Sequence, residues 1–141
     1  MDARRQPLWV STHGGRSRQG TTSCRAPMIV ADMIGDRDLG IRREAASTPW
    51  LTDILWASAA RLGHQRELPA RLLPVEDDHA PFLRVGVPAA LLIDFDYPPW
   101  HTAEDTLDKV SARSLEIVGS VLLDALPAIE DRLTRSPGAR P

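Results

Sequence analysis

The chain carries the apolar run Val87-Pro88-Ala89-Ala90-Leu91-Leu92-Ile93, which polar residues follow directly. A continuous apolar run of this length predicts a buried strand, and Pro88 stands near its start, where the missing N–H is tolerated. A second run, Met28-Ile29-Val30-Ala31-Asp32-Met33-Ile34, predicts another buried strand that ends at Gly35. The two runs therefore indicate two buried strands.

Helical patterns lie between these runs and after them. Thr48-Pro49 is typical of a helix start, the spacing predicts a helix as far as Leu62, and Gly63 ends it. We expect Ser111 to cap a last helix, whose apolar face would hold Leu115, Val118, Leu122, Leu126, Ile129 and Leu133.

The remaining segments are shorter and more polar. We expect loops over residues 36–46 and 94–108, a short strand over 72–75 and a helical turn over 81–84. Strands and helices in alternation favour an α/β fold with parallel strands. Two or three strands are few for a free-standing sheet of that kind, so we expect the chain to form part of something larger.

Composition sets outer limits on fold and function. A length of 141 residues suits one domain, and 43% hydrophobic with 26% charged residues is an ordinary soluble composition. No stretch approaches the roughly 18 apolar residues of a membrane span, so we expect no membrane partner. The single cysteine, Cys24, excludes an internal disulfide and a cysteine-based zinc knuckle.

The two ends of the chain differ from its middle. Residues 1–27 hold five arginines against one acid and almost no apolar pattern, which predicts a disordered or non-native basic segment. A nucleic-acid-binding arm is the less favoured alternative, because scattered arginines are a weak signal. We expect residues 28–135 to form the folded unit and residues 136–141 a disordered tail.

Acids and histidines stand just after the predicted strands, where open α/β sheets bind ligands. Asp32 ends the first run, Glu76-Asp77-Asp78-His79 precedes the second, and Trp100-His101 follows it. Carboxylate and imidazole ligands without thiolates suit zinc, manganese or cobalt. The plainer alternatives are a backbone-bonding Asp32, a half-buried structural His79 and a packing loop around Trp100.

The same residues resemble the zinc-dependent aminopeptidase and glutaminyl cyclase family, the co-catalytic zinc exopeptidases. The matching pieces are Ala31-Asp32-Met33-Ile34-Gly35-Asp36, Glu76-Asp77-Asp78-His79-Ala80-Pro81-Phe82, Gly86-Val87-Pro88 and Trp100-His101-Thr102-Ala103-Glu104-Asp105-Thr106. The resemblance covers residues 28 to about 133, which look like the C-terminal half of the family's domain. It implies a partial three-layer α/β/α sandwich with a mostly parallel sheet.

The resemblance also implies roles for single residues. His101 would be a zinc ligand, and Asp32 a carboxylate ligand of a second metal or, in single-zinc cyclases, a hydrogen-bonding acid beside the zinc. Asp77 would be a supporting acid of that network. Trp100 would wall the pocket for the substrate's N-terminal side chain, while Asp78 and His79 would support the site.

Part of the family pattern is missing upstream. This sequence has neither the family's His-x-Asp motif nor its Glu-Glu or Asp-Glu pair before Asp32. The resemblance thus implies a zinc exopeptidase that hydrolyses peptide N-termini by a metal-activated water, with weak or absent zinc binding and little activity in this chain. Cyclisation of an N-terminal glutamine and a non-catalytic binding module are the alternatives. Missing strands would leave a sheet edge exposed and favour self-association.

Overall fold

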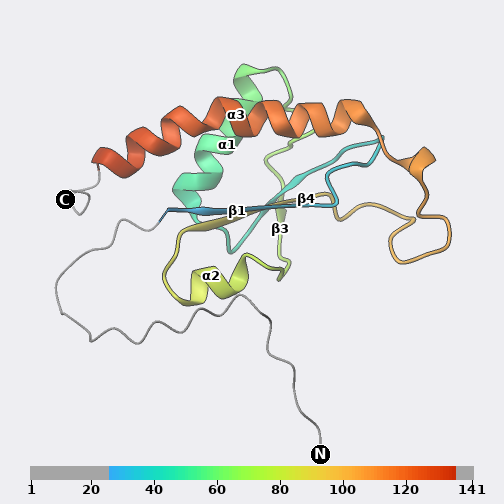
Figure 1. Ribbon diagram of the computed structural model, residues 1–141, viewed down its shortest axis with the longest axis horizontal. Coiled ribbons are helices and arrows are strands. Elements are labelled where there is room, and N and C mark those ends of the chain that lie inside the picture. The colour runs from blue at the N-terminus through green and yellow to red at the C-terminus, as the bar shows by residue number, and fades with distance from the viewer. Residues whose placement is uncertain (1–25, 136–141) are drawn as a thin grey trace, which may run out of the picture.

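The computed structural model describes residues 26–135 (Figure 1). The strands are β1 (Met28–Asp32), β2 (Arg42–Glu44), β3 (Leu72–Leu73) and β4 (Ala89–Ile93). The helices are α1 (Pro49–Arg61), α2 (Ala80–Arg84), the 3-10 turn η1 (Leu107–Lys109) and α3 (Ala112–Arg135).

The four strands form one mixed sheet in the order β1-β4-β2-β3. β1 runs parallel to β4, with Met28 opposite Ala89 and Asp32 opposite Ile93, and β2 runs parallel to β3. β2 and β4 are antiparallel. The predicted α/β class with a mostly parallel sheet is confirmed, and the antiparallel pair in its middle was not expected.

β2 also corrects the prediction of a loop over residues 36–46. Leu39 and Ile41 lead into this strand, and the Ile41 side chain has no exposed surface. The charged residues of β2 gain partners instead of water, because Arg42 pairs with Asp96 and Arg43 donates to the Thr52 hydroxyl at 2.7 Å. Tertiary contacts of this kind give strand structure to a segment whose sequence looks solvated.

Helices cover both faces of the sheet, as expected for three layers. α1 and α3 lie on one face, and the short α2 lies on the other (Figure 1). Every residue of β4 is buried. Its neighbours in the core are Leu51, Leu55 and Ala59 of α1 and Val118, Val121 and Ala125 of α3.

The helix boundaries agree with the sequence pattern, but two details differ. Thr48 does not cap α1 with its side chain; its hydroxyl accepts the Ala89 N–H at 3.0 Å and so ties the helix start to β4. On α3, Leu115 and Leu126 are about half exposed, because the helix presents Val118 and Ile129 to the core instead.

Most of the two predicted terminal segments, residues 1–27 and 136–141, lies outside the described residues. Among residues 26–135, no helix has both the length and the apolar character to cross a bilayer.

Candidate functional site

Two loops meet at the carboxyl ends of the parallel strands β1 and β4. The loop after β1 pairs with the loop after β4 through a bridge between Asp36 and Val110. The Ser111 N–H donates to the Gly35 carbonyl at 2.8 Å, and the Ser114 hydroxyl of α3 donates to the Asp36 carbonyl at 2.5 Å. These bonds hold the two loops together as one rim.

A cavity of about 160 Å³ opens in this rim. Its lining is partly apolar and partly acidic, with Met33, Gly35, Asp36, Tyr97, Trp100, Asp105 and Val110. Trp100 is 45% exposed, and its ring lies 5.4 Å from that of Phe95. The indole therefore forms an accessible wall of the cavity, next to carboxylates that suit a positively charged group.

Asp32 and His101 do not line the cavity, but each is the sequence neighbour of a residue that does, Met33 and Trp100 respectively. Asp32 is the last residue of β1, and its Oδ1 accepts the N–H of Met33, which has a positive φ of 52°. His101 also has a positive φ, 59°, and its ring lies 4.3 Å from the Trp100 ring. A positive φ is costly for a residue with a bulky side chain, so the backbone is strained at two points beside the cavity.

The Tyr97 hydroxyl fixes the loop that follows β4. It donates to Asp105 Oδ1 at 2.6 Å, across the turn that carries Trp100 and His101. This hydrogen bond, with the negative charge of Asp105 behind it, raises the pKa of Tyr97 to about 12. The phenol therefore stays protonated near neutral pH and acts as a hydrogen-bond donor, not as a base.

Asp94 connects the loop after β1 to the loop after β4. It is buried, and its Oδ2 accepts the Gly40 N–H at 2.8 Å while its Oδ1 accepts the Asp96 N–H at 3.2 Å. Burial raises the pKa of Asp94, and the nearby carboxylates of Asp36 and Asp38 act in the same direction. Its bonds to two backbone N–H groups assign it a structural part in the fold.

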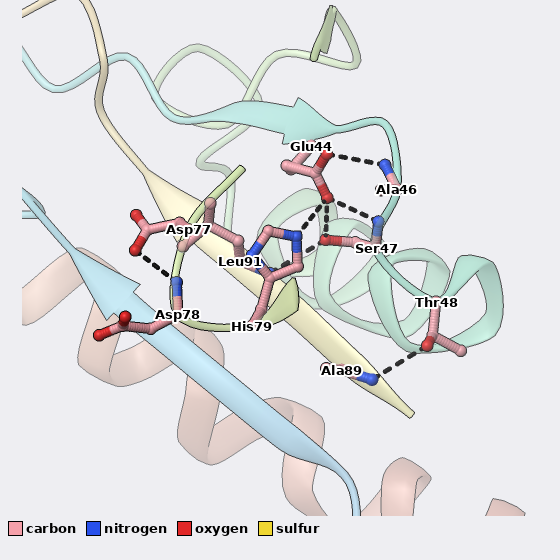
Figure 2. Close-up of polar contacts among 9 residues, drawn as sticks. All are labelled: Glu44, Ala46, Ser47, Thr48, Asp77, Asp78, His79, Ala89 and Leu91. Carbon is pink, nitrogen blue, oxygen red and sulfur yellow. Dashed lines mark hydrogen bonds and ion pairs between the residues drawn. The ribbon is translucent and has the colours of Figure 1, made fainter. Parts of the chain in front are cut away.

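His79 is fully buried, which corrects the alternative of a half-buried histidine. Its Nε2 lies 2.9 Å from Glu44 Oε2 at the end of β2 (Figure 2). Glu44 also accepts the N–H groups of Ala46 and Ser47 and the Ser47 hydroxyl. Burial alone would raise the pKa of Glu44, but these bonds and His79 outweigh it and lower that pKa.

Glu44 was not among the residues predicted from the sequence. It stands in the run Arg42-Arg43-Glu44, which looks like a solvated charged segment. The alternation of Leu39, Ile41 and Arg43 was the available signal for a strand, and it was too short to stand out.

Asp77 and Asp78 lie in the turn before α2. Asp77 Oδ1 accepts the Asp78 N–H at 2.6 Å, and both carboxylates point away from the buried His79 (Figure 2). Neither residue lines the cavity beside Trp100. Asp78 is exposed and Asp77 is partly exposed, so both remain open to water.

The donors on the rim fit zinc in kind but not in number. Imidazole nitrogen and carboxylate oxygen are ligands that zinc accepts. Within residues 26–135, however, no group of three or more histidine, cysteine or acidic side chains gathers closely enough to hold a metal ion. Asp32 and His101 would supply two of the ligands, and others would have to come from outside the described residues.

Solved structures share the fold of this chain. The chain is similar to the crystal structure of a glutaminyl cyclase from an Acidobacteriales bacterium, with a TM-score of 0.71 and 47% identity over 74% of this chain and 39% of that one. It also shares the fold of a Zn-dependent exopeptidase from Parabacteroides distasonis, with a TM-score of 0.65 and 21% identity over 72% of this chain and 39% of that one. The architecture is thus that of the glutaminyl cyclases and zinc exopeptidases.

Sequence comparison gives the family. Residues 17–126 match the model of peptidase family M28, and the chain belongs to this family. Among curated proteins, it is 43% identical over 53 residues to a glutaminyl-peptide cyclotransferase of Boiga irregularis, which is 37% of this chain and 14% of that protein. The chain therefore spans only a fraction of the length of the relatives it matches.

Proposed function

We propose that this chain carries the C-terminal part of a zinc-dependent site that acts on peptide N-termini, and that the reaction is cyclisation of an N-terminal glutamine. The observation that carries the proposal is the cavity of about 160 Å³ at the carboxyl ends of β1 and β4. Trp100 lines this cavity, the ring of His101 lies 4.3 Å from that of Trp100, and Asp32 directly precedes the lining residue Met33. The 47% identity to a solved glutaminyl cyclase supports cyclisation over hydrolysis.

The proposal assigns a role to each residue around the cavity. His101 and Asp32 hold the zinc or, for Asp32, a hydrogen bond beside it, and Trp100 packs against the glutamine side chain. Asp36 and Asp105 face the cavity and attract the substrate's α-ammonium group. When bound, zinc would polarise the side-chain amide carbonyl. After the α-ammonium loses a proton to water, the α-amine would bond to that carbonyl carbon. The amide C–N bond would break, and one proton of the attacking amine would pass to the leaving nitrogen, which departs as ammonia.

Hydrolysis at the N-terminus is the second candidate. The match to peptidase family M28 favours it, because that family is described as a family of peptidases. A non-catalytic binding module that keeps only the rim is a third. The three differ in product, since cyclisation releases ammonia, hydrolysis releases a free amino acid, and a binding module releases neither.

Calorimetric zinc titration of the full 141-residue chain tests the metal site. We expect weak binding, because a zinc ion held by two protein ligands loses much of the stability of a closed tetrahedral site. Asp32→Ala and His101→Ala should each weaken it further, by about tenfold or more. The matched control is His64→Ala, which removes a histidine that lies 3.8 Å from Glu67 and does not line the cavity beside Trp100.

The same zinc-loaded samples test the reaction. A glutaminyl peptide is incubated with each variant, and ammonia and free amino acid are both measured. Ammonia release that is lost in His101→Ala supports cyclisation, and amino acid release supports hydrolysis. If zinc binding is equal in the unaltered chain, Asp32→Ala and His101→Ala, the proposed metal site is wrong.

A further inference from the structure

A second cavity, of about 220 Å³, lies beside the start of α3. It is separate from the cavity beside Trp100, because no residue lines both. At the bridge between the two loops, Asp36 and Val110 line the first cavity, whereas the residues that follow them, Arg37 and Ser111, line the second. The second cavity is therefore a distinct place for a ligand, with a lining of its own.

Main-chain hydrogen bonds hold the walls of this second cavity together. The Ile41 N–H donates to the Glu67 carbonyl at 2.8 Å, which joins the segment before β2 to the loop after α1. The Ser114 hydroxyl donates to the Asp36 carbonyl at 2.5 Å, which joins the loop after β1 to α3. Because carbonyl groups make these bonds, the charged side chains of the lining are not used to close the cavity.

Charges of both signs line the cavity. Each of two loops supplies an arginine that is followed by an acid, Arg37-Asp38 in one and Arg66-Glu67 in the other. Among residues 26–135, the side chains of Arg37, Asp38 and Arg66 form no ion pair. Opposite charges that line one hollow without neutralising each other are available to a ligand that carries both charges.

The rest of the lining supports the same kind of ligand. A third arginine, Arg113, pairs with Glu116 at 3.0 Å, so its charge is already offset. Leu39 and Ile117 are buried and give the cavity an apolar part. The volume is below the roughly 300–1,000 Å³ of pockets for drug-sized molecules, which indicates a ligand of few heavy atoms.

We propose that this cavity binds a single free amino acid with an apolar side chain. Arg37 and Arg66 bind the carboxylate, because a guanidinium group pairs with a carboxylate through two parallel hydrogen bonds. Asp38 and Glu67 accept hydrogen bonds from the ammonium group, and the apolar side chain packs on Leu39. The site needs no metal, so it stands apart from the proposed zinc site.

Titration of the zinc-free 141-residue chain with L-leucine tests the proposal. The NMR amide shifts of Glu67 and Ser114 should move and saturate, whereas those of Met33 and Trp100, which line the other cavity, should stay. Two analogues each lack one charge, since N-acetyl-L-leucine has no ammonium group and L-leucinamide has no carboxylate. We expect each analogue to bind about tenfold or more weakly than leucine, because hydrogen bonds between charged groups are lost.

Two variants test the two signs of charge in the cavity. Arg66→Gln removes a guanidinium group and Asp38→Asn removes a carboxylate. Both side chains are exposed, so we expect the fold to be kept, and circular dichroism checks it. Each variant should bind leucine about tenfold more weakly. The matched control, Arg71→Gln, alters an exposed arginine that lines neither cavity and should leave the affinity unchanged.

Three results would overturn the proposal. One is the absence of saturating shifts at Glu67 and Ser114 up to about 10 mM leucine. Another is an analogue that binds as tightly as leucine, which would make the cavity a site for a single charge. The last is an unchanged leucine affinity in Arg66→Gln or in Asp38→Asn. Leucine binding in a chain that binds no zinc would support this proposal and count against the proposed function alone.

Discussion

The hydrogen bond from Tyr97 to Asp105 can be tested by following the ionisation of the Tyr97 phenol. Tyr97 is the only tyrosine of the chain, so tyrosinate absorbance reports this residue alone. Its pKa is raised from 10.0 to about 12, because the phenol donates to a carboxylate. A raised folded-state pKa means that the bond stabilises the fold fully below the unfolded pKa of 10.0, and that this contribution is lost as pH rises toward 12.

We expect Asp105→Ala to bring the titration of Tyr97 back toward 10.0. At about pH 11 the phenol should then be mostly protonated in the unaltered chain and mostly ionised in the variant. Ultraviolet absorbance measures this, and circular dichroism of the same samples shows that both chains are still folded. Identical titration of the two chains would mean that Asp105 does not hold the Tyr97 hydroxyl in solution.

Single residues of the rim were easier to predict than the buried pair. Asp32, Trp100 and His101 stand out because polar and aromatic residues follow apolar runs, and their roles remain predictions. Glu44 did not stand out, since its partner His79 lies 35 positions away in the sequence. A buried hydrogen bond between residues so far apart depends on strand pairing, and local sequence patterns carry no information on that pairing.

Among the elements, β1, β4, α1 and α3 were predicted close to their observed limits. Each has a local signal, either an apolar run or a helical repeat with a recognisable start. β2 has only three residues, Arg42–Glu44, and all three are charged. Its strand structure comes from pairing with β4 on one side and β3 on the other, which explains why residues 36–46 looked like a loop.

Substitution of Ile41, the residue before β2, tests whether residues 36–46 contribute a strand to the core rather than a loop. Ile41 is fully buried in the main core, so Ile41→Ala should lower the free energy of unfolding by roughly 2–5 kcal/mol. Leu72→Ala in β3 is the matched control, because Leu72 is 65% exposed and its loss should change that free energy by less than about 0.5 kcal/mol. Urea unfolding measures the free energy of unfolding of both variants. Equally small effects of the two substitutions would mean that Ile41 is not buried and that residues 36–46 form a surface loop.

The molecule as a whole covers 39% of the solved glutaminyl cyclase it resembles. Its sheet ends at β1, which has β4 as its only partner strand among residues 26–135. Met28, Ile29 and Val30 of this strand are half-buried, and Ala31 is exposed. An edge strand of this kind presents unpaired N–H and C=O groups to other chains, so the sequence-based expectation of self-association falls on β1.

The register shows which groups are free at that edge. The Met28 N–H donates to the Pro88 carbonyl beside β4, and residues two apart in a strand point the same way. The N–H groups of Met28, Val30 and Asp32 therefore face β4, while those of Ile29 and Ala31 face outward. Ala31→Pro removes one outward N–H, and Val30→Pro removes a ladder N–H instead.

We expect Ala31→Pro to reduce self-association of the chain while its fold is kept, because proline takes a donor from the open edge and adds bulk there. Sedimentation velocity over a range of protein concentrations measures the association, and circular dichroism measures the fold. Val30→Pro should instead lower stability, since it breaks the β1–β4 ladder. If Ala31→Pro associates as strongly as the unaltered chain, the contact lies elsewhere, and the exposed Leu123 and Leu126 on α3 become the surface to alter next.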